Sequence, residues 1–140
     1  MQFRTIAAGA ALCLLMAGAA QAKMVHFMAK LSGATEVPAN DSAGTGSVMG
    51  MLDTDTKTFT YSATYSGLSG PAGAAHFHVA AAPGGNGPPV VPVANAASPI
   101  SGTATLTDAQ IADLTAGKWY FNVHTAAHPG GEVRGWLTAQ

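Results

Sequence analysis

Alternation between apolar and polar residues dominates the chain from residue 24 onward and predicts β-strands, in which successive side chains point to opposite faces. The pattern is clearest over residues 58–66, where Phe, Tyr and Ala alternate with Thr and Ser. It predicts further strands over residues 24–31, 42–52, 74–80, 100–106, 118–125 and 132–138, with a brief extended segment at 90–93. Clusters of Gly, Pro, Asn and Asp between these segments predict turns and loops.

A short helix is predicted before the last strands. Thr107 and Gln110 have the spacing of a capping box, in which the side chain of each residue bonds to the backbone of the other. Ile111 and Leu114 give the following one or two helical turns an apolar side, and Gly117 is placed to end the helix. About seven or eight antiparallel strands and one helix, in a single domain over residues 23–140, predict an all-β Greek-key sandwich or barrel.

The first 22 residues have the three-part pattern of a secretory signal peptide. Arg4 provides a positive charge, residues 5–19 are almost wholly apolar, and Ala20-Gln21-Ala22 has small residues where signal peptidase needs them. We therefore expect cleavage before Lys23 and a periplasmic or secreted location. The apolar run is shorter than the roughly 20 residues needed to cross a bilayer, so a retained membrane anchor is the weaker interpretation.

Composition narrows the class of partner. Charged residues make up 9% of the chain, and the formal net charge at pH 7 is −1, or −2 once Arg4 leaves with the signal peptide. No basic patch is visible, so nucleic acid is not an expected partner. Cys13 is the single cysteine, and the bulky Leu12 before it disfavours lipidation. Cleavage would leave a mature chain without membrane attachment, disulfide or thiolate metal ligand.

Three segments resemble one known domain family. They are residues 31–38 (LSGATEVP), residues 66–78 with the Asn86-Gly87-Pro88 that follows, and residues 122–135 (NVHTAAHPGGEVRG). Together they look like the CHRD domain, named after chordin, and the resemblance covers nearly all of the chain after residue 22. In chordin-like animal proteins the domain accompanies binding of growth factors, whereas in bacteria it often stands alone after a signal peptide. The resemblance therefore implies a domain but leaves its function open.

Four of the five histidines fall in two short motifs. His76 and His78 are two residues apart on a predicted strand, so both imidazoles point to the same face, roughly 6–7 Å apart at their roots. His124 lies near the end of another predicted strand, and His128 begins the turn after it. If these strands are neighbours, three or four imidazoles can bind one metal ion. The alternative is that these histidines bond to backbone groups of the sheet.

The identity of the metal follows from the ligand type. All-imidazole sites suit copper and zinc, and the general order of affinities favours copper. A His-x-His pair with a distant His and a C-terminal Arg is similar to the copper centre of copper/zinc superoxide dismutases, which are also Greek-key β-sandwiches. Residues 79–100 contain no His or Asp for the zinc site of those enzymes, so the similarity implies a copper-only centre. Iron would want a carboxylate, for which Glu132 is the candidate, and is less expected than copper.

Arg134 has two interpretations. As a catalytic residue, its guanidinium would guide a small anion such as superoxide toward the metal. As a structural residue, it would pair with Glu132 on the same strand face. Glu36 and Asn86 lie in the family motifs and are expected to bond loop backbone, although Glu36 could instead orient a ligand histidine.

A second candidate copper site lies on the first predicted strand. Alternation places Met24, His26 and Met28 on one face, and Met49 and Met51 would join them if the first two strands pair. Thioethers together with an imidazole suit Cu(I). The alternative is a flexible apolar surface or a homodimer contact, because methionine fills irregular packing well.

Three functions are open at this point. The first is an exported copper protein with a centre of His76, His78 and His124, and His128 as fourth ligand, which dismutates superoxide. The second is a copper carrier or store without catalysis, for which the methionine face would be characteristic. The third is a metal-free protein-interaction module, as in chordin.

Overall fold

The computed structural model describes residues 23–140, so the expected signal peptide over residues 1–22 lies outside the described residues. Residues 23–140 form nine β-strands, one α-helix and one short 3₁₀ turn. Within this range, no helix has both the length and the apolar character needed to cross a bilayer.

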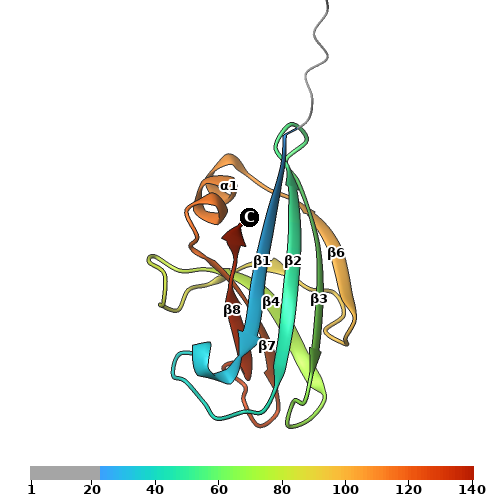
Figure 1. Ribbon diagram of the computed structural model, residues 1–140, viewed down its shortest axis with the longest axis vertical. Coiled ribbons are helices and arrows are strands. Elements are labelled where there is room, and N and C mark those ends of the chain that lie inside the picture. Colours follow the sequence, from blue (N-terminus) through green and yellow to red (C-terminus); the bar gives the residue numbers. More distant parts are fainter. Residues whose placement is uncertain (1–22) are drawn as a thin grey trace, which may run out of the picture.

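The strands form one antiparallel sheet that curves into a nearly closed barrel. They are β1 (Met24–Ser32), β2 (Thr45–Asp53), β3 (Thr58–Ser66), β4 (Ala72–Val79), β5 (Pro89–Pro92), β6 (Ile100–Thr105), β7 (Trp119–Thr125), β8 (Val133–Trp136) and β9 (Thr138–Ala139). Their order is β5-β4-β7-β8-β1-β2-β3-β6, and β9 pairs with β1. Figure 1 shows β1, β2, β3 and β6 side by side, with β4 and β7 behind them. The connections from β3 to β4 and from β6 to β7 join strands that are not neighbours, as in Greek-key folds, and the predicted fold class is confirmed.

Aromatic side chains fill the inside of the barrel. The ring centroid of Phe59 lies 5.4 Å from that of Phe77, 5.9 Å from Trp119 and 6.5 Å from Phe27, all in edge-to-face arrangements. Phe121 lies 4.8 Å from Phe77, and all five side chains are at most 1% exposed. These residues occupy the apolar side of the alternating pattern, so that side of each strand faces the core.

The helix α1 (Asp108–Thr115) begins at the predicted capping box. The backbone N–H of Gln110 donates to Thr107 Oγ1 at 3.2 Å, and the backbone N–H of Thr107 donates to Gln110 Oε1 at 2.9 Å. Leu114 is buried in the core. Gly117 follows the helix with a φ of 73°, a left-handed conformation that glycine adopts without strain, so the predicted end of the helix is confirmed.

Most strand boundaries lie within two residues of the predicted ones, and the two largest differences are at β2 and at the last predicted strand. β2 begins three residues later because the Ser42 hydroxyl accepts a bond from the Gly44 N–H and donates to Glu132 Oε1, which holds this segment in a loop. The last predicted strand is divided at Leu137 into β8 and β9. The Leu137 N–H donates to the Trp119 carbonyl of β7, whereas the two residues after it pair with β1.

Candidate metal centre

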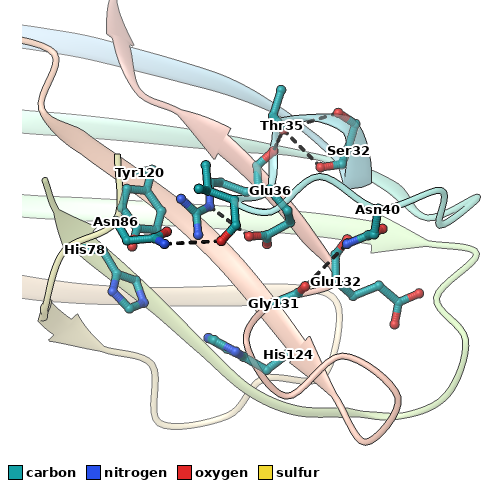
Figure 2. Close-up of polar contacts among 12 residues, drawn as sticks. Ser32, Thr35, Glu36, Asn40, His78, Asn86, Tyr120, His124, Gly131 and Glu132 are labelled. Atoms are coloured by element: carbon teal, nitrogen blue, oxygen red, sulfur yellow. Dashed lines mark hydrogen bonds and ion pairs between the residues drawn. The ribbon is translucent and has the colours of Figure 1, made fainter. Parts of the chain in front are cut away.

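The candidate ligands lie on the outer face of β4 and β7. Phe77 points into the core, so the histidines on either side of it, His76 and His78, point outward. His124 reaches the same face from β7, where its register partner on β4 is Ala74. The pairing of β4 with β7 therefore brings the two histidine motifs together. Figure 2 shows His78 and His124 on the same side of these strands.

The three imidazoles converge on a small volume. One ring nitrogen from each of His76, His78 and His124 lies within 4.8 Å of the others. His76 Nδ1 is 3.2 Å from His124 Nε2, and the ring centroids of His76 and His78 are 5.5 Å apart. Nitrogens on opposite sides of one bound ion would be about 4 Å apart, because metal–nitrogen bonds are about 2.0–2.1 Å long. Small ring rotations are therefore enough to place all three nitrogens around one ion.

Backbone carbonyls orient two of the three rings. His78 Nδ1 donates to the Gly87 carbonyl at 2.8 Å, and His124 Nδ1 donates to the Pro129 carbonyl at 2.9 Å. These bonds assign the proton to Nδ1, so the Nε2 atom of each ring carries a free lone pair. His78 Nε2 is buried and has no hydrogen-bond partner among residues 23–140. A buried polar atom of this kind is costly unless something binds it.

The same environment favours the neutral form of His78 and of His124. Burial lowers the pKa of His78, and repulsion from His76, His124 and Arg134 lowers it further, against an opposing effect of the Gly87 carbonyl. Burial likewise lowers the pKa of His124, with the Pro129 carbonyl opposing and His76 and Arg134 reinforcing the shift. Only a neutral imidazole can bind a metal ion, so the site is prepared for a cation at neutral pH.

Tyr120 packs against the imidazole of His78, a contact that the sequence did not indicate. Its ring stacks on His78 with centroids 4.7 Å apart and an interplanar angle of 4°. The guanidinium carbon of Arg134 lies 4.0 Å from the centroid of the same Tyr120 ring. The carbonyls that orient the histidines were also missed, although Gly87 and Pro129 both occur in the family motifs.

Arg134 pairs with Glu36, so the predicted pairing with Glu132 is wrong. Arg134 Nε donates to Glu36 Oε2 at 2.9 Å, and both side chains are 2% exposed. Arg134 Nη1 also donates to the Gly85 carbonyl at 3.1 Å. Burial raises the pKa of Glu36, and the positive charge of Arg134 offsets part of that rise. Arg134 thus ties the loops over residues 33–44 and 80–88 to β8.

Asparagine side chains fasten the same two loops. Asn86 Nδ2 donates to the Val37 carbonyl at 3.2 Å, and Asn40 Nδ2 donates to the Glu132 carbonyl at 3.1 Å, as Figure 2 shows. The prediction that Asn86 bonds loop backbone is therefore confirmed. Among residues 23–140, the side chain of Glu36 is hydrogen-bonded to Arg134 and to none of the three candidate ligand histidines.

His128 is not among the three histidines that group together within residues 23–140. Its backbone forms the turn after β7, through bonds with Thr125 and Gly131. Its side chain lines a groove of about 250 Å³ together with Glu36 and residues 37–40. The metal-capable group found among residues 23–140 contains only His76, His78 and His124, so His128 as fourth ligand stays a prediction.

Glu132 is buried and saturated with hydrogen bonds. Its Oε1 accepts from the Ser42 hydroxyl and the Ser69 N–H, both at 2.7 Å, and its Oε2 accepts from the hydroxyls of Ser69 at 2.7 Å and Thr125 at 2.6 Å. Burial alone would raise the pKa of Glu132, but the bonds from Thr125, Ser42 and Ser69 lower it to about 2. A carboxylate engaged in this way joins loops and is not available as an iron ligand.

We expect Glu132→Gln to destabilise the fold at pH 7 by about 2–3 kcal/mol, because bonds to a charged acceptor are lost and a donor replaces an oxygen that only accepts. The native carboxyl has a lower pKa than the unfolded one, so its contribution is present above pH 4.5 and is lost as the pH falls toward 2. Urea unfolding of both proteins at several pH values measures this. A difference between them that does not shrink below pH 4.5 would contradict the assignment.

Comparison with known proteins identifies the family. A family model described as the CHRD domain matches residues 27–137, a range that includes all three histidines of the group and Arg134. A search of curated proteins and a search of solved structures each found no match. Since the matched range covers most of the chain, the protein belongs to the CHRD domain family.

Proposed function

We propose that the protein is an exported copper-binding protein in which His76, His78 and His124 hold one copper ion. The observation that carries this proposal is the convergence of three imidazole nitrogens, with His78 Nε2 buried and unbonded within the described chain. A hydrogen bond between His76 and His124 would account for one contact in a metal-free protein, but it leaves His78 Nε2 without a partner. A bound cation would satisfy all three nitrogens.

The donor set favours copper over zinc and iron. Three neutral nitrogens without thiolate or carboxylate suit copper, which also has the highest affinity among the common divalent metals. Residues 23–140 contain no cysteine. The buried carboxylates of residues 23–140 are Glu36, which is bonded to Arg134, and Glu132, which is bonded to hydroxyl groups, so neither supports an iron site.

Titration with Cu(II), followed by electron paramagnetic resonance, tests this proposal. We expect one Cu(II) per chain with hyperfine coupling to imidazole nitrogen, and a dissociation constant well below about 1 μM. Zinc should compete only weakly. Absence of a nitrogen-coupled signal at one equivalent, or a dissociation constant no better than that of free imidazole, would leave the chain as a metal-free interaction domain.

Superoxide dismutation is a second candidate function, favoured by the partial exposure of His76 and His124. Three protein ligands leave room for a water molecule or a small anion on the exposed side. Copper at such a site would supply redox chemistry, taking an electron from one superoxide to give oxygen and passing it to a second, which with two protons gives hydrogen peroxide. A superoxide assay on copper-loaded protein, with excess chelator to remove free copper, separates an enzyme from a carrier or store.

A further inference from the structure

Methionines gather on the outer face of β1 and β2, away from the inward aromatic cluster. All four methionines of the described residues, Met24, Met28, Met49 and Met51, lie on this face with His26. Met24, Met28 and Met49 are 41%, 45% and 58% exposed. Large apolar residues exposed together on a monomer usually mark a binding surface.

The strand register brings four of these side chains into direct proximity. Met28 of β1 lies opposite Met49 of β2, and His26 lies opposite Met51. Opposed residues on one face of an antiparallel pair have Cβ atoms about 4.5–5.5 Å apart, and diagonal neighbours are within reach of long side chains. Flexible thioethers at such spacing can therefore meet the imidazole of His26 at one point.

A groove of about 580 Å³ lies over these residues. His26, Met28, Met49 and Met51 all line it, and the remaining lining is mostly small or uncharged, including Thr60, Ser62, Ser101 and Gln140. Met24 is not part of the lining and lies opposite Asp53 at the end of the strand pair. Of the four methionines and one histidine on this face, all but Met24 therefore line the groove.

We propose that His26, Met28, Met49 and Met51 form a binding site for Cu(I), distinct from the three-histidine centre. Thioether sulfur is a soft ligand that selects Cu(I) over divalent ions, and an imidazole is a suitable fourth donor. The largely uncharged lining suits a monovalent cation better than a divalent one. The two sites share no residue, so this site stands or falls independently of the proposed function. Together the two sites would hold copper in either oxidation state.

The residue types favour a metal over a purely apolar partner. At the outward positions of β1 and β2, every apolar residue is methionine, and none is Leu, Ile, Val or Phe. An apolar docking surface would be served as well by any of these. Only methionine adds a sulfur donor, and a metal would also use the imidazole of His26, which a purely apolar partner would not.

Anaerobic titration with Cu(I) against a coloured Cu(I) chelator tests the site. We expect Met28→Leu/Met49→Leu, which preserves volume, to weaken Cu(I) binding by about a hundredfold or more without altering the nitrogen-coupled Cu(II) signal. Met24→Leu is the matched control, because it makes the same change on the same strand outside the groove, and it should alter Cu(I) affinity less than about threefold. X-ray absorption of the wild-type Cu(I) complex should show sulfur atoms among the nearest neighbours of the copper.

Three results would overturn the site. One is unchanged Cu(I) affinity in the double-leucine variant, and another is a Cu(I) complex with nitrogen neighbours alone. The third is a copper-independent dimer, detected by light scattering and lost in Met49→Ser, which would assign this face to a second copy of the chain.

Discussion

Replacing His78 with alanine is expected to lower the affinity for Cu(II) more than a hundredfold. Loss of a group that merely orients a metal ligand typically costs about 10–100-fold, and His78 is placed as a ligand itself. Its Nε2 is buried and unbonded within residues 23–140, so no other described group can replace it at that point. Competition between the protein and a chelator of known affinity measures the change.

His128→Ala is the matched comparison for this variant. If His128 lies outside the centre, as its position beside the loop over residues 37–40 indicates, Cu(II) affinity should change less than about tenfold. A loss as large as that of His78→Ala would make His128 the fourth ligand. Circular dichroism must show folded protein in each case. Because His78 is packed against Tyr120, His124→Ala at a partly exposed position provides a second ligand variant. Unchanged affinity in both ligand variants would contradict the proposed centre.

Arg134→Ala is expected to destabilise the fold by about 3–5 kcal/mol, since it leaves the Glu36 carboxylate buried and unpaired. The ion pair is 2% exposed on both sides, and the same guanidinium holds the Gly85 carbonyl and lies against Tyr120. Urea unfolding, monitored by tryptophan fluorescence, measures the loss. Glu36→Gln in the Arg134→Ala background should restore part of the stability, because it removes the unpaired charge.

A partly exposed ion pair provides the control for Arg134. Lys118 and Asp113 are 3.1 Å apart with side chains 38% and 35% exposed, so Lys118→Ala should cost less than about 1 kcal/mol. A similarly small loss for Arg134→Ala would contradict the structural role. If stability were unchanged while superoxide turnover of the copper-loaded protein fell, Arg134 would instead guide the anion, as first interpreted.

The fold could be predicted from the sequence because local patterns determine most of it. Alternation identified the inward residues, and the capping box at Thr107 identified the start of α1. The strand order could not be predicted, since no local pattern states that β7 inserts between β4 and β8. The late start of β2 was also missed, because it depends on a bond between Ser42 and the distant Glu132.

The sequence predicted the histidines of the candidate site, but it did not predict which residues their neighbours bond to. The spacing of His76 and His78 gave their shared face, and their convergence with His124 was an inference that needed strand pairing. The partner of Arg134 was predicted from proximity on one strand, whereas the true partner Glu36 is 98 residues away in sequence. Such pairs form because two charged side chains distant in sequence are buried side by side in the fold, and a single sequence does not show which side chains are buried together.

Phe77, the residue between His76 and His78, connects the candidate centre to the interior of the barrel. Its ring contacts Phe59 and Trp119 on one side of the strand while the two imidazoles extend from the other. A shift of Phe77 would move the backbone that carries both imidazoles, so metal affinity would report on the packing of this ring. The relationship is reciprocal by thermodynamic linkage, and a metal present at a hundred times its dissociation constant would add about 2.7 kcal/mol to the stability of the whole barrel. Supply or withdrawal of the ion would then regulate the lifetime of the protein as well as its chemistry.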